Sequence, residues 1–349
     1  MSGSLQGLLA ALKKNDEPAP YAIAIASDSS PYIVAYPWTT TGFGTKFTNP
    51  ATLPSDVGYK ATFSPSGNAI VVSSYQSPYI IAYPWTSSGF GTKFSNPAAL
   101  PASIGWDAAF SPSGSALAVA HAGSPYITAY SWSSSGFGTK FSDPVTLPTD
   151  TGYGVAFSPA GDAIAVAHNT SPYVTAYPWS GSGFGAKFSD PATLVSGNAR
   201  GVTFIPAGNV IVATHFTTPF VTAYSWSGSG FGTKFTDPAT LPAGDAKYAA
   251  FSPAGSAIAV AHATSPYITT YAWSGSGFGT KFANPATLPT GTGYSVAFSP
   301  AGDAIAVAHA TSPYITAYPW SGSGFGTKFT NPGTLPIGTG FGVAFTTNP

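Results

Sequence analysis

The chain has 349 residues, of which only 7% are charged, and its 12 lysines and arginines balance 12 aspartates and glutamates to a net charge of zero. This composition excludes a basic surface for a nucleic-acid backbone, so no nucleic-acid partner is expected. The absence of cysteine excludes disulfides and thiolate chemistry. No apolar run approaches the length of a membrane span, so membrane insertion is not expected either.

Residues 1–20 precede the repeated part of the chain and are predicted to form a separate N-terminal arm. Four leucines follow the i, i+3, i+4, i+7 spacing of one helix face: Leu5, Leu8, Leu9 and Leu12. The arm is either a frayed tail or a short helix through which the chain assembles with a partner or a second copy. The short apolar run and the lysines after it do not fit a signal peptide, which leaves the cytoplasm and a virus particle open as locations.

Residues 21–349 are predicted to form one domain, because a unit of 47 residues recurs seven times along them. The proline of an S-P-Y triplet, which reads T-P-F in the fifth unit, marks each unit: Pro31, Pro78, Pro125, Pro172, Pro219, Pro266 and Pro313. A tryptophan keeps the same step: Trp38, Trp85, Trp132, Trp179, Trp226, Trp273 and Trp320. A fixed period of this length is typical of propellers and solenoids.

Each unit is predicted to contain four short strands and no helix. In the clearest copy the strands are expected at 152–157, 162–168, 171–179 and 184–191, with a tight S-P-A-G turn after the first. Proline or glycine interrupts every stretch before a helical pattern of ten residues develops. The sequence therefore predicts an all-β fold, a seven-bladed propeller of four-stranded antiparallel blades.

The unit resembles a WD-repeat propeller in its V-A-F-S-P-x-G turn, its small-residue second strand and the aromatic residue that ends its third strand. The resemblance covers residues 18 to 345 and implies that the first strand of each blade lines a central channel. The Gly-His and Trp-Asp pairs of that family are absent, with Y-P-W as the nearest equivalent, and no binding residue is carried over. The repeats also have a loose likeness to those of some phage and viral-metagenome proteins.

The two ends of the repeated part are predicted to close the ring. Residues 341–345 match a first strand that has no partners after it, whereas residues 22–27 match a second strand. The last blade is therefore expected to combine the C-terminal strand with three N-terminal strands, which removes any open ring end.

The repeated side chains are interpreted as framework. Tyr177 and Trp179 share one face of a strand, where they are either packing between blades or sugar-stacking platforms, and packing is favoured. The repeat lysine of the fourth strand, such as Lys187, is expected to protect the blade edge and to pair weakly with the Asp or Asn three residues later.

All five histidines share one position of the repeat: His121, His168, His215, His262 and His309. Ser27 and Ser74 take this position in the other two units, which indicates a hydrogen-bonding role inside each blade. Equivalent positions in neighbouring blades are expected about 10 Å apart, too far to share a metal ion. We therefore predict a structural histidine ring without metal, and a protein without cofactor.

Departures from the repeat gather at two positions near the start of the first strand. Every lysine and arginine outside the arm and the repeat lysines lies there, as does the only tryptophan outside the repeat. At one channel mouth these residues would form a surface that stacks on rings and pairs with anions. The alternative is drift at a solvated rim. The predicted ligand- or partner-binding residues are Tyr59, Lys60, Trp106, Asp107, Tyr153, Arg200, Lys247, Tyr248, Tyr294 and Phe341.

The function favoured by the sequence is a non-catalytic binding or structural propeller that holds a protein partner or ligand at this mouth, as part of a larger assembly such as a virion. The alternative is a multivalent lectin with repeated sites for a glycan. An enzyme is not expected, because Glu17 is the only glutamate and no nucleophile–base pair or paired carboxylates can be identified.

Overall fold

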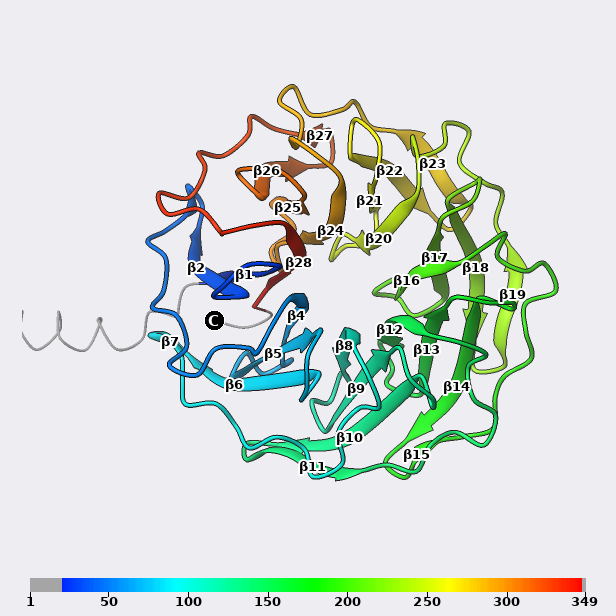
Figure 1. Ribbon diagram of the computed structural model, residues 1–349. Coiled ribbons are helices and arrows are strands. Elements are labelled where there is room, and N and C mark those ends of the chain that lie inside the picture. The colour runs from blue at the N-terminus through cyan, green and yellow to red at the C-terminus, as the bar shows by residue number, and fades with distance from the viewer. Residues whose placement is uncertain (1–20, 347–349) are drawn as a thin grey trace, which may run out of the picture.

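The computed structural model describes residues 21–346 as seven four-stranded antiparallel sheets arranged as blades around a central channel (Figure 1). Within this range there is no helix, and hence none long and apolar enough to cross a membrane. The predicted seven-bladed propeller is confirmed. The arm of residues 1–20, with its leucines, lies outside the described residues.

The strands of each blade follow one another from the channel outward. The innermost strands are β4 (Gly58–Phe63), β8 (Gly105–Phe110), β12 (Gly152–Phe157), β16 (Ala199–Phe204), β20 (Ala246–Phe251), β24 (Gly293–Phe298) and β28 (Gly340–Phe345). The second strands are β5 (Ala69–Ser74), β9 (Ala116–His121), β13 (Ala163–His168), β17 (Val210–His215), β21 (Ala257–His262), β25 (Ala304–His309) and β1 (Ala22–Ser27).

The third strands are β6 (Ile80–Thr86), β10 (Ile127–Ser133), β14 (Val174–Ser180), β18 (Val221–Ser227), β22 (Ile268–Ser274), β26 (Ile315–Ser321) and β2 (Ile33–Thr39). The outermost strands are β7 (Gly89–Phe90), β11 (Gly136–Lys140), β15 (Gly183–Phe184), β19 (Gly230–Lys234), β23 (Gly277–Lys281), β27 (Gly324–Phe325) and β3 (Gly42–Phe43).

The ring closes as the sequence predicts. Strand β28, from the C-terminal end, pairs antiparallel with β1, and the sheet runs in the order β28, β1, β2, β3 (Figure 1). Phe345 lies opposite Ile23, and its ring contacts Trp38 at 5.1 Å. The first and last segments of the described chain therefore share one blade core.

The third strand begins later than predicted. In the blade of residues 152–194 it starts at Val174, because Tyr173 has a φ of +70°, in the left-handed region that a strand does not use. The same residue has a positive φ in all seven blades.

The outermost strand is also shorter than predicted in all seven blades, and in four of them it spans only two residues. In these blades the Y-x-W segment of the third strand contains a proline: Pro37, Pro84, Pro178 and Pro319. Proline has no N–H to donate to a neighbouring strand. Where serine or alanine replaces it, at Ser131, Ser225 and Ala272, the outermost strand extends to five residues.

The blades pack a face of large side chains onto a face of small ones, as predicted. Tyr177, Trp179 and Val166 of one blade lie against Ala118 and Ala120 of the preceding blade. The Trp179 ring makes edge contacts with three phenylalanine rings at 5.0–5.1 Å and is 8% exposed. The repeat tryptophans are therefore core residues, and the reading of them as sugar-stacking platforms is wrong.

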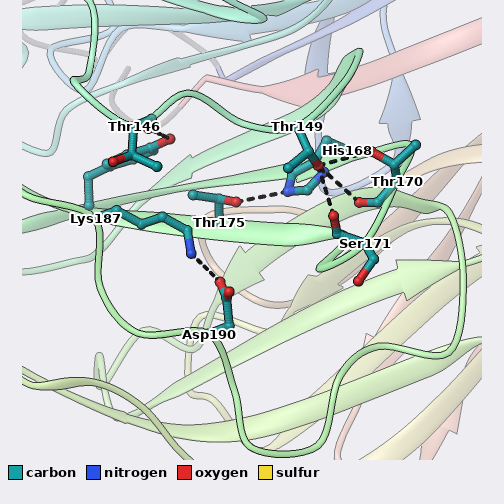
Figure 2. A network of polar contacts seen from close by, with 9 residues as sticks. Thr146, Thr149, His168, Thr170, Ser171, Thr175, Lys187 and Asp190 are labelled. Carbon is teal, nitrogen blue, oxygen red and sulfur yellow. Dashed lines mark hydrogen bonds and ion pairs between the residues drawn. The ribbon is translucent and has the colours of Figure 1, made fainter.

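The repeat lysines pair locally at the outer edge. Lys187 pairs with Asp190 (Figure 2), with Nζ 2.5 Å from the carboxylate. Lys140 Nζ lies 2.6 Å from Asp143 in another blade. Both partners stay partly exposed, so each pair contributes about 0–1 kcal/mol to stability.

Each histidine of the ring forms a hydrogen bond with a threonine inside its own blade. In Figure 2, His168 Nε2 lies 2.9 Å from the hydroxyl of Thr175, and the four other pairs have distances of 2.8–3.0 Å. Burial lowers the pKa of these histidines to about 4, so they are neutral at pH 7. The predicted hydrogen-bonding role is confirmed.

The two blades without histidine lack the threonine as well. Ser27 and Ser74 are accompanied by Val34 and Ile81 at the threonine position. The two positions therefore change together, from a polar pair to a serine beside an apolar residue. Among residues 21–346 no group of three or more His, Asp or Glu side chains is arranged to hold a metal. Absence of metal from the purified protein stays a prediction, which elemental analysis checks.

The paired replacement leads to a stability prediction. We expect His168→Ser to lower the free energy of unfolding by about 1–3 kcal/mol at pH 7, because it leaves the buried Thr175 hydroxyl without a partner. The double variant His168→Ser/Thr175→Val reproduces the natural pair and should recover most of this loss. Denaturant unfolding of the three proteins measures the effect, and a double variant less stable than the single one would contradict it.

Candidate functional site

One mouth of the central channel holds a cavity of about 190 Å³ that is built from all ten residues predicted to form the site. Each of the ten is the second or third residue of an innermost strand. Because these strands surround the channel, side chains from all seven blades meet at this mouth. The cavity lining consists of Tyr59, Lys60, Trp106, Asp107, Tyr153, Arg200, Phe216, Lys247, Tyr248, Tyr294, Ser295 and Phe341.

The innermost strands are crowded, which explains why some blades have glycine as the third residue of this strand. A Cβ on Gly342 would lie 2.7 Å from Lys60 Cα, and one on Gly154 would lie 2.8 Å from the Arg200 carbonyl oxygen. These distances are too short for a side chain in the same geometry. The remaining blades contribute Lys60, Asp107, Tyr248 and Ser295 to the cavity lining from this position.

Lys60 reaches across the channel and forms the floor of the cavity. Its Nζ lies 3.4 Å from the centre of the Tyr248 ring and donates a hydrogen bond of 3.2 Å to Ser295 Oγ. These partners come from β20 and β24, whereas Lys60 is on β4, with β28 between β24 and β4 around the ring. Lys60 and Tyr248 also line a second cavity of about 320 Å³ in the channel, so they separate the two cavities.

The floor holds an amine and a carboxyl group whose pKa values are shifted toward neutrality. Burial lowers the pKa of Lys60 to about 8, although the charge of Asp107 opposes the shift. Burial raises the pKa of Asp107 to about 6, against the effect of Lys60 and of two backbone N–H groups. At pH 7 the favoured state is an ionised Asp107 beside a protonated Lys60.

Backbone hydrogen bonds fix the Asp107 carboxylate. Oδ1 accepts the N–H of Ala108 at 2.8 Å, and Oδ2 accepts the N–H of Val155, on the neighbouring blade, at 3.1 Å. The residue is 3% exposed. A carboxylate has about four acceptor sites, so two remain for a water molecule or a ligand. Lys60 likewise has donors left beyond the one used by Ser295.

Five aromatic rings form a continuous wall along one side of the cavity. The distances between neighbouring ring centres are 4.8 Å from Tyr294 to Phe341, 5.4 Å from Phe341 to Tyr59, 4.3 Å from Tyr59 to Trp106 and 5.3 Å from Trp106 to Tyr153. Burial raises the pKa of Tyr59 to about 12, so its hydroxyl is neutral. Such a wall suits stacking on the face of a ring.

Two cations complete the rim. The Arg200 guanidinium lies between two rings, with its Cζ 3.6 Å from the centre of Tyr153 and 4.2 Å from that of Phe216. Lys247 Nζ lies 4.0 Å from the centre of the same Phe216 ring. Burial lowers the pKa of both cations, and the charge of Asp245 opposes this in each case.

Two lining residues were missed by the sequence analysis. Phe216 follows the repeat histidine directly, a position occupied by Ala122 and Asn169 in two other units. The sequence therefore varies at this position as well, and not only at the second and third residues of the innermost strand. Ser295 lies at one of those positions, but its short neutral side chain gave no reason to select it.

No protein-family model and no curated protein sequence matches the chain. The fold, in contrast, is similar to that of many solved structures. A candidate 6-phosphogluconolactonase of Bacteroides uniformis has a TM-score of 0.73 at 16% identity, over 94% of this chain and 99% of that one. A second, from Bacteroides fragilis, has a TM-score of 0.74 at 11% identity, over 94% and 98%.

A periplasmic gluconolactonase of Pseudomonas aeruginosa has a TM-score of 0.70 at 16% identity, over 94% of this chain and all of that one. At these identities the likeness establishes the propeller fold. The propeller part of the WD-repeat resemblance is therefore confirmed, whereas nothing in the comparisons supports the WD repeat itself or the viral likeness.

The prediction of a non-catalytic binding or structural propeller is corrected by these findings, together with its lectin alternative. Solved structures of the same fold and nearly the same length carry lactonase names. The sequence showed no nucleophile–base pair and no paired carboxylates, because side chains that meet in the channel lie far apart along the chain. The groups with shifted pKa values, Lys60 and Asp107, come from two neighbouring blades and are 47 residues apart.

Proposed function

We propose that this protein is a lactone hydrolase that acts in the mouth cavity, with Asp107 as general base and Lys60 as the group that stabilises the oxyanion. The observation that carries the proposal is a carboxyl group with a pKa of about 6 and an amine with a pKa of about 8 that line one cavity and interact through their charges. Perturbed pairs of this kind are typical of active sites. The lactonase names of similar structures suggest the reaction class, which fold alone does not determine.

The proposed reaction uses the free acceptor sites of Asp107 and the free donors of Lys60. Asp107 takes a proton from water as the water oxygen attacks the lactone carbonyl carbon. The Lys60 ammonium stabilises the negative charge that develops on the carbonyl oxygen. The bond from that carbon to the ring oxygen then breaks, and the ring oxygen receives the proton from Asp107. The product is a hydroxy acid.

The size of the cavity supports a substrate with a single ring. Its volume of about 190 Å³ is below the roughly 300–1,000 Å³ of pockets that hold drug-sized ligands. The wall formed by Tyr59, Trp106 and Phe341 offers aromatic faces to the carbon side of such a ring. The lactone of a small sugar acid fits these requirements.

The proposal is tested by the hydrolysis of D-glucono-1,5-lactone and of its 6-phosphate, followed in a pH-stat and corrected for spontaneous hydrolysis. We expect the wild type to accelerate hydrolysis of at least one of them and Lys60→Met to lower kcat by about 10²–10³-fold. Lys93→Met, a repeat lysine at the outer edge, is the matched control and should keep the wild-type rate. Failure of the wild type to exceed spontaneous hydrolysis of both lactones would refute the proposed function.

A further inference from the structure

The mouth cavity contains more positive charge than the proposed chemistry needs. Asp107 provides the base and Lys60 the oxyanion-stabilising group, whereas Arg200 and Lys247 belong to other blades of the rim and have no assigned task. These are two of the three cations that lie outside the arm and the repeat lysines. Both lie against Phe216, which the other units do not have at this position.

We propose that Arg200 and Lys247 form a subsite for an anionic substituent of the substrate, a phosphate or a carboxylate. This inference rests on the proposed function, and it defines which lactones the site prefers. The names of the similar structures do not decide this point, because two refer to a phosphorylated gluconolactone and one to gluconolactone.

Arg200 is held in place by aromatic side chains of the protein itself. Its guanidinium is stacked between the rings of Tyr153 and Phe216, at 3.6 and 4.2 Å from their centres. Contact with the two rings restricts the guanidinium, and its Nε–H has no partner among residues 21–346. A fixed guanidinium presents two parallel donors to a phosphate or carboxylate.

The cavity lining also contains two buried hydrogen-bond donors without acceptors. Arg200 Nε and Trp106 Nε1 are both buried, and residues 21–346 provide neither with a hydrogen-bond partner. Both residues flank Tyr153 and both line the cavity. An unpaired buried donor is costly, and a ligand that carries acceptor oxygens would remove this cost.

The charge of Asp245 acts on both cations of the proposed subsite. Its charge interacts with both Arg200 and Lys247, so it partly offsets the two cations when no anion is bound. The Asp245 backbone carbonyl accepts the N–H of Ala263, and asparagine would preserve that contact. Asp245→Asn should therefore strengthen the binding of anionic ligands, whereas the loss of Arg200 or Lys247 should weaken it.

The test compares kcat/KM for three probes: D-glucono-1,5-lactone, which is neutral, its 6-phosphate, and the carboxylated D-glucaro-1,4-lactone. We expect Arg200→Gln to lower the ratio of anionic to neutral kcat/KM by roughly 10–100-fold, mainly through KM, and Lys247→Met to lower it by a smaller factor. Asp245→Asn should raise the ratio several-fold, and Lys93→Met should leave it unchanged. The two anionic probes decide between a phosphate and a carboxylate.

Binding measured without turnover separates this inference from the proposed function. Calorimetry compares gluconate with 6-phosphogluconate and glucarate, each of which carries one further anionic group. At least one of these two should bind more tightly than gluconate, and Arg200→Gln should lose this preference. The wild type and Arg200→Gln could both hydrolyse lactones with the same ratio of anionic to neutral kcat/KM. This result would overturn the anion subsite and leave the proposed hydrolase function standing. An Arg200-dependent preference in a protein that hydrolyses no lactone would support the subsite and refute the hydrolase.

Discussion

Replacement of Asp107 by asparagine is expected to lower kcat for lactone hydrolysis by about 10²–10⁴-fold, the usual loss for a general base. The amide cannot accept a proton from water at neutral pH. It keeps the shape of the side chain and one acceptor oxygen, which can still receive the N–H of Val155 or that of Ala108. The measurement is the initial rate at pH 7 with each of the three lactones.

A loss of folding would mimic this result, so it must be measured separately. Asparagine presents an NH₂ group to one of the two backbone N–H donors, which costs about 1–3 kcal/mol of stability. A thermal melt and calorimetric binding of gluconate establish that the variant is folded and that its cavity still binds. Asp143→Asn, in an exposed pair with Lys140, is the matched control. An Asp107→Asn protein that hydrolyses lactones at the wild-type rate would refute the role of this carboxylate.

Deletion of residues 340–349 is expected to cause the largest loss of stability. It removes strand β28, which pairs with β1 and packs between β24 and β4. Val343 and Phe345, which are 1% and 6% exposed, would leave the core of the closing blade. Burial of these two side chains alone is worth about 3–6 kcal/mol, and the open edge of β1 would favour aggregation.

Ring closure can be examined by thermal melts of the deletion variant with and without a synthetic peptide of residues 340–349. We expect a strongly lowered Tm that the peptide partly restores, because it supplies the missing strand in trans. Deletion of residues 347–349 alone is the control. An unchanged Tm after removal of residues 340–349 would contradict closure through β28.

The sequence predicted the architecture because every unit repeats the same local choices. The 47-residue period, the proline and glycine turns and the phases of the two ends are all visible in the chain, and together they require seven blades and a shared last one. The length of the outermost strand was missed, although its determinant, a proline such as Pro178 or a serine such as Ser131, is equally visible. The start of the third strand depends on the backbone of Tyr173, which no residue pattern revealed.

The convergence of the candidate site residues at the channel mouth was predictable from the sequence, whereas their burial was not. Departures from the repeat identified the residues that meet at the mouth, because the repeat itself carries the framework. The chemistry depends on burial: an exposed Lys60 and Asp107 would have ordinary pKa values, whereas in the channel both are shifted toward neutrality. Phe216 was missed because it comes from the loop after β17, outside the strand position that brings the other rim residues together.

The pH dependence of kcat/KM for the preferred lactone tests most directly whether Lys60 and Asp107 work as a pair. An ionised Asp107 and a protonated Lys60 are both required, so the rate should rise with pH through about 6 and fall through about 8. The profile should be bell-shaped with a maximum near pH 7, and Lys60→Met should lose the fall on the alkaline side. A flat profile between pH 5 and 9, or a bell that persists unchanged in Lys60→Met, would contradict the assignment of these two residues.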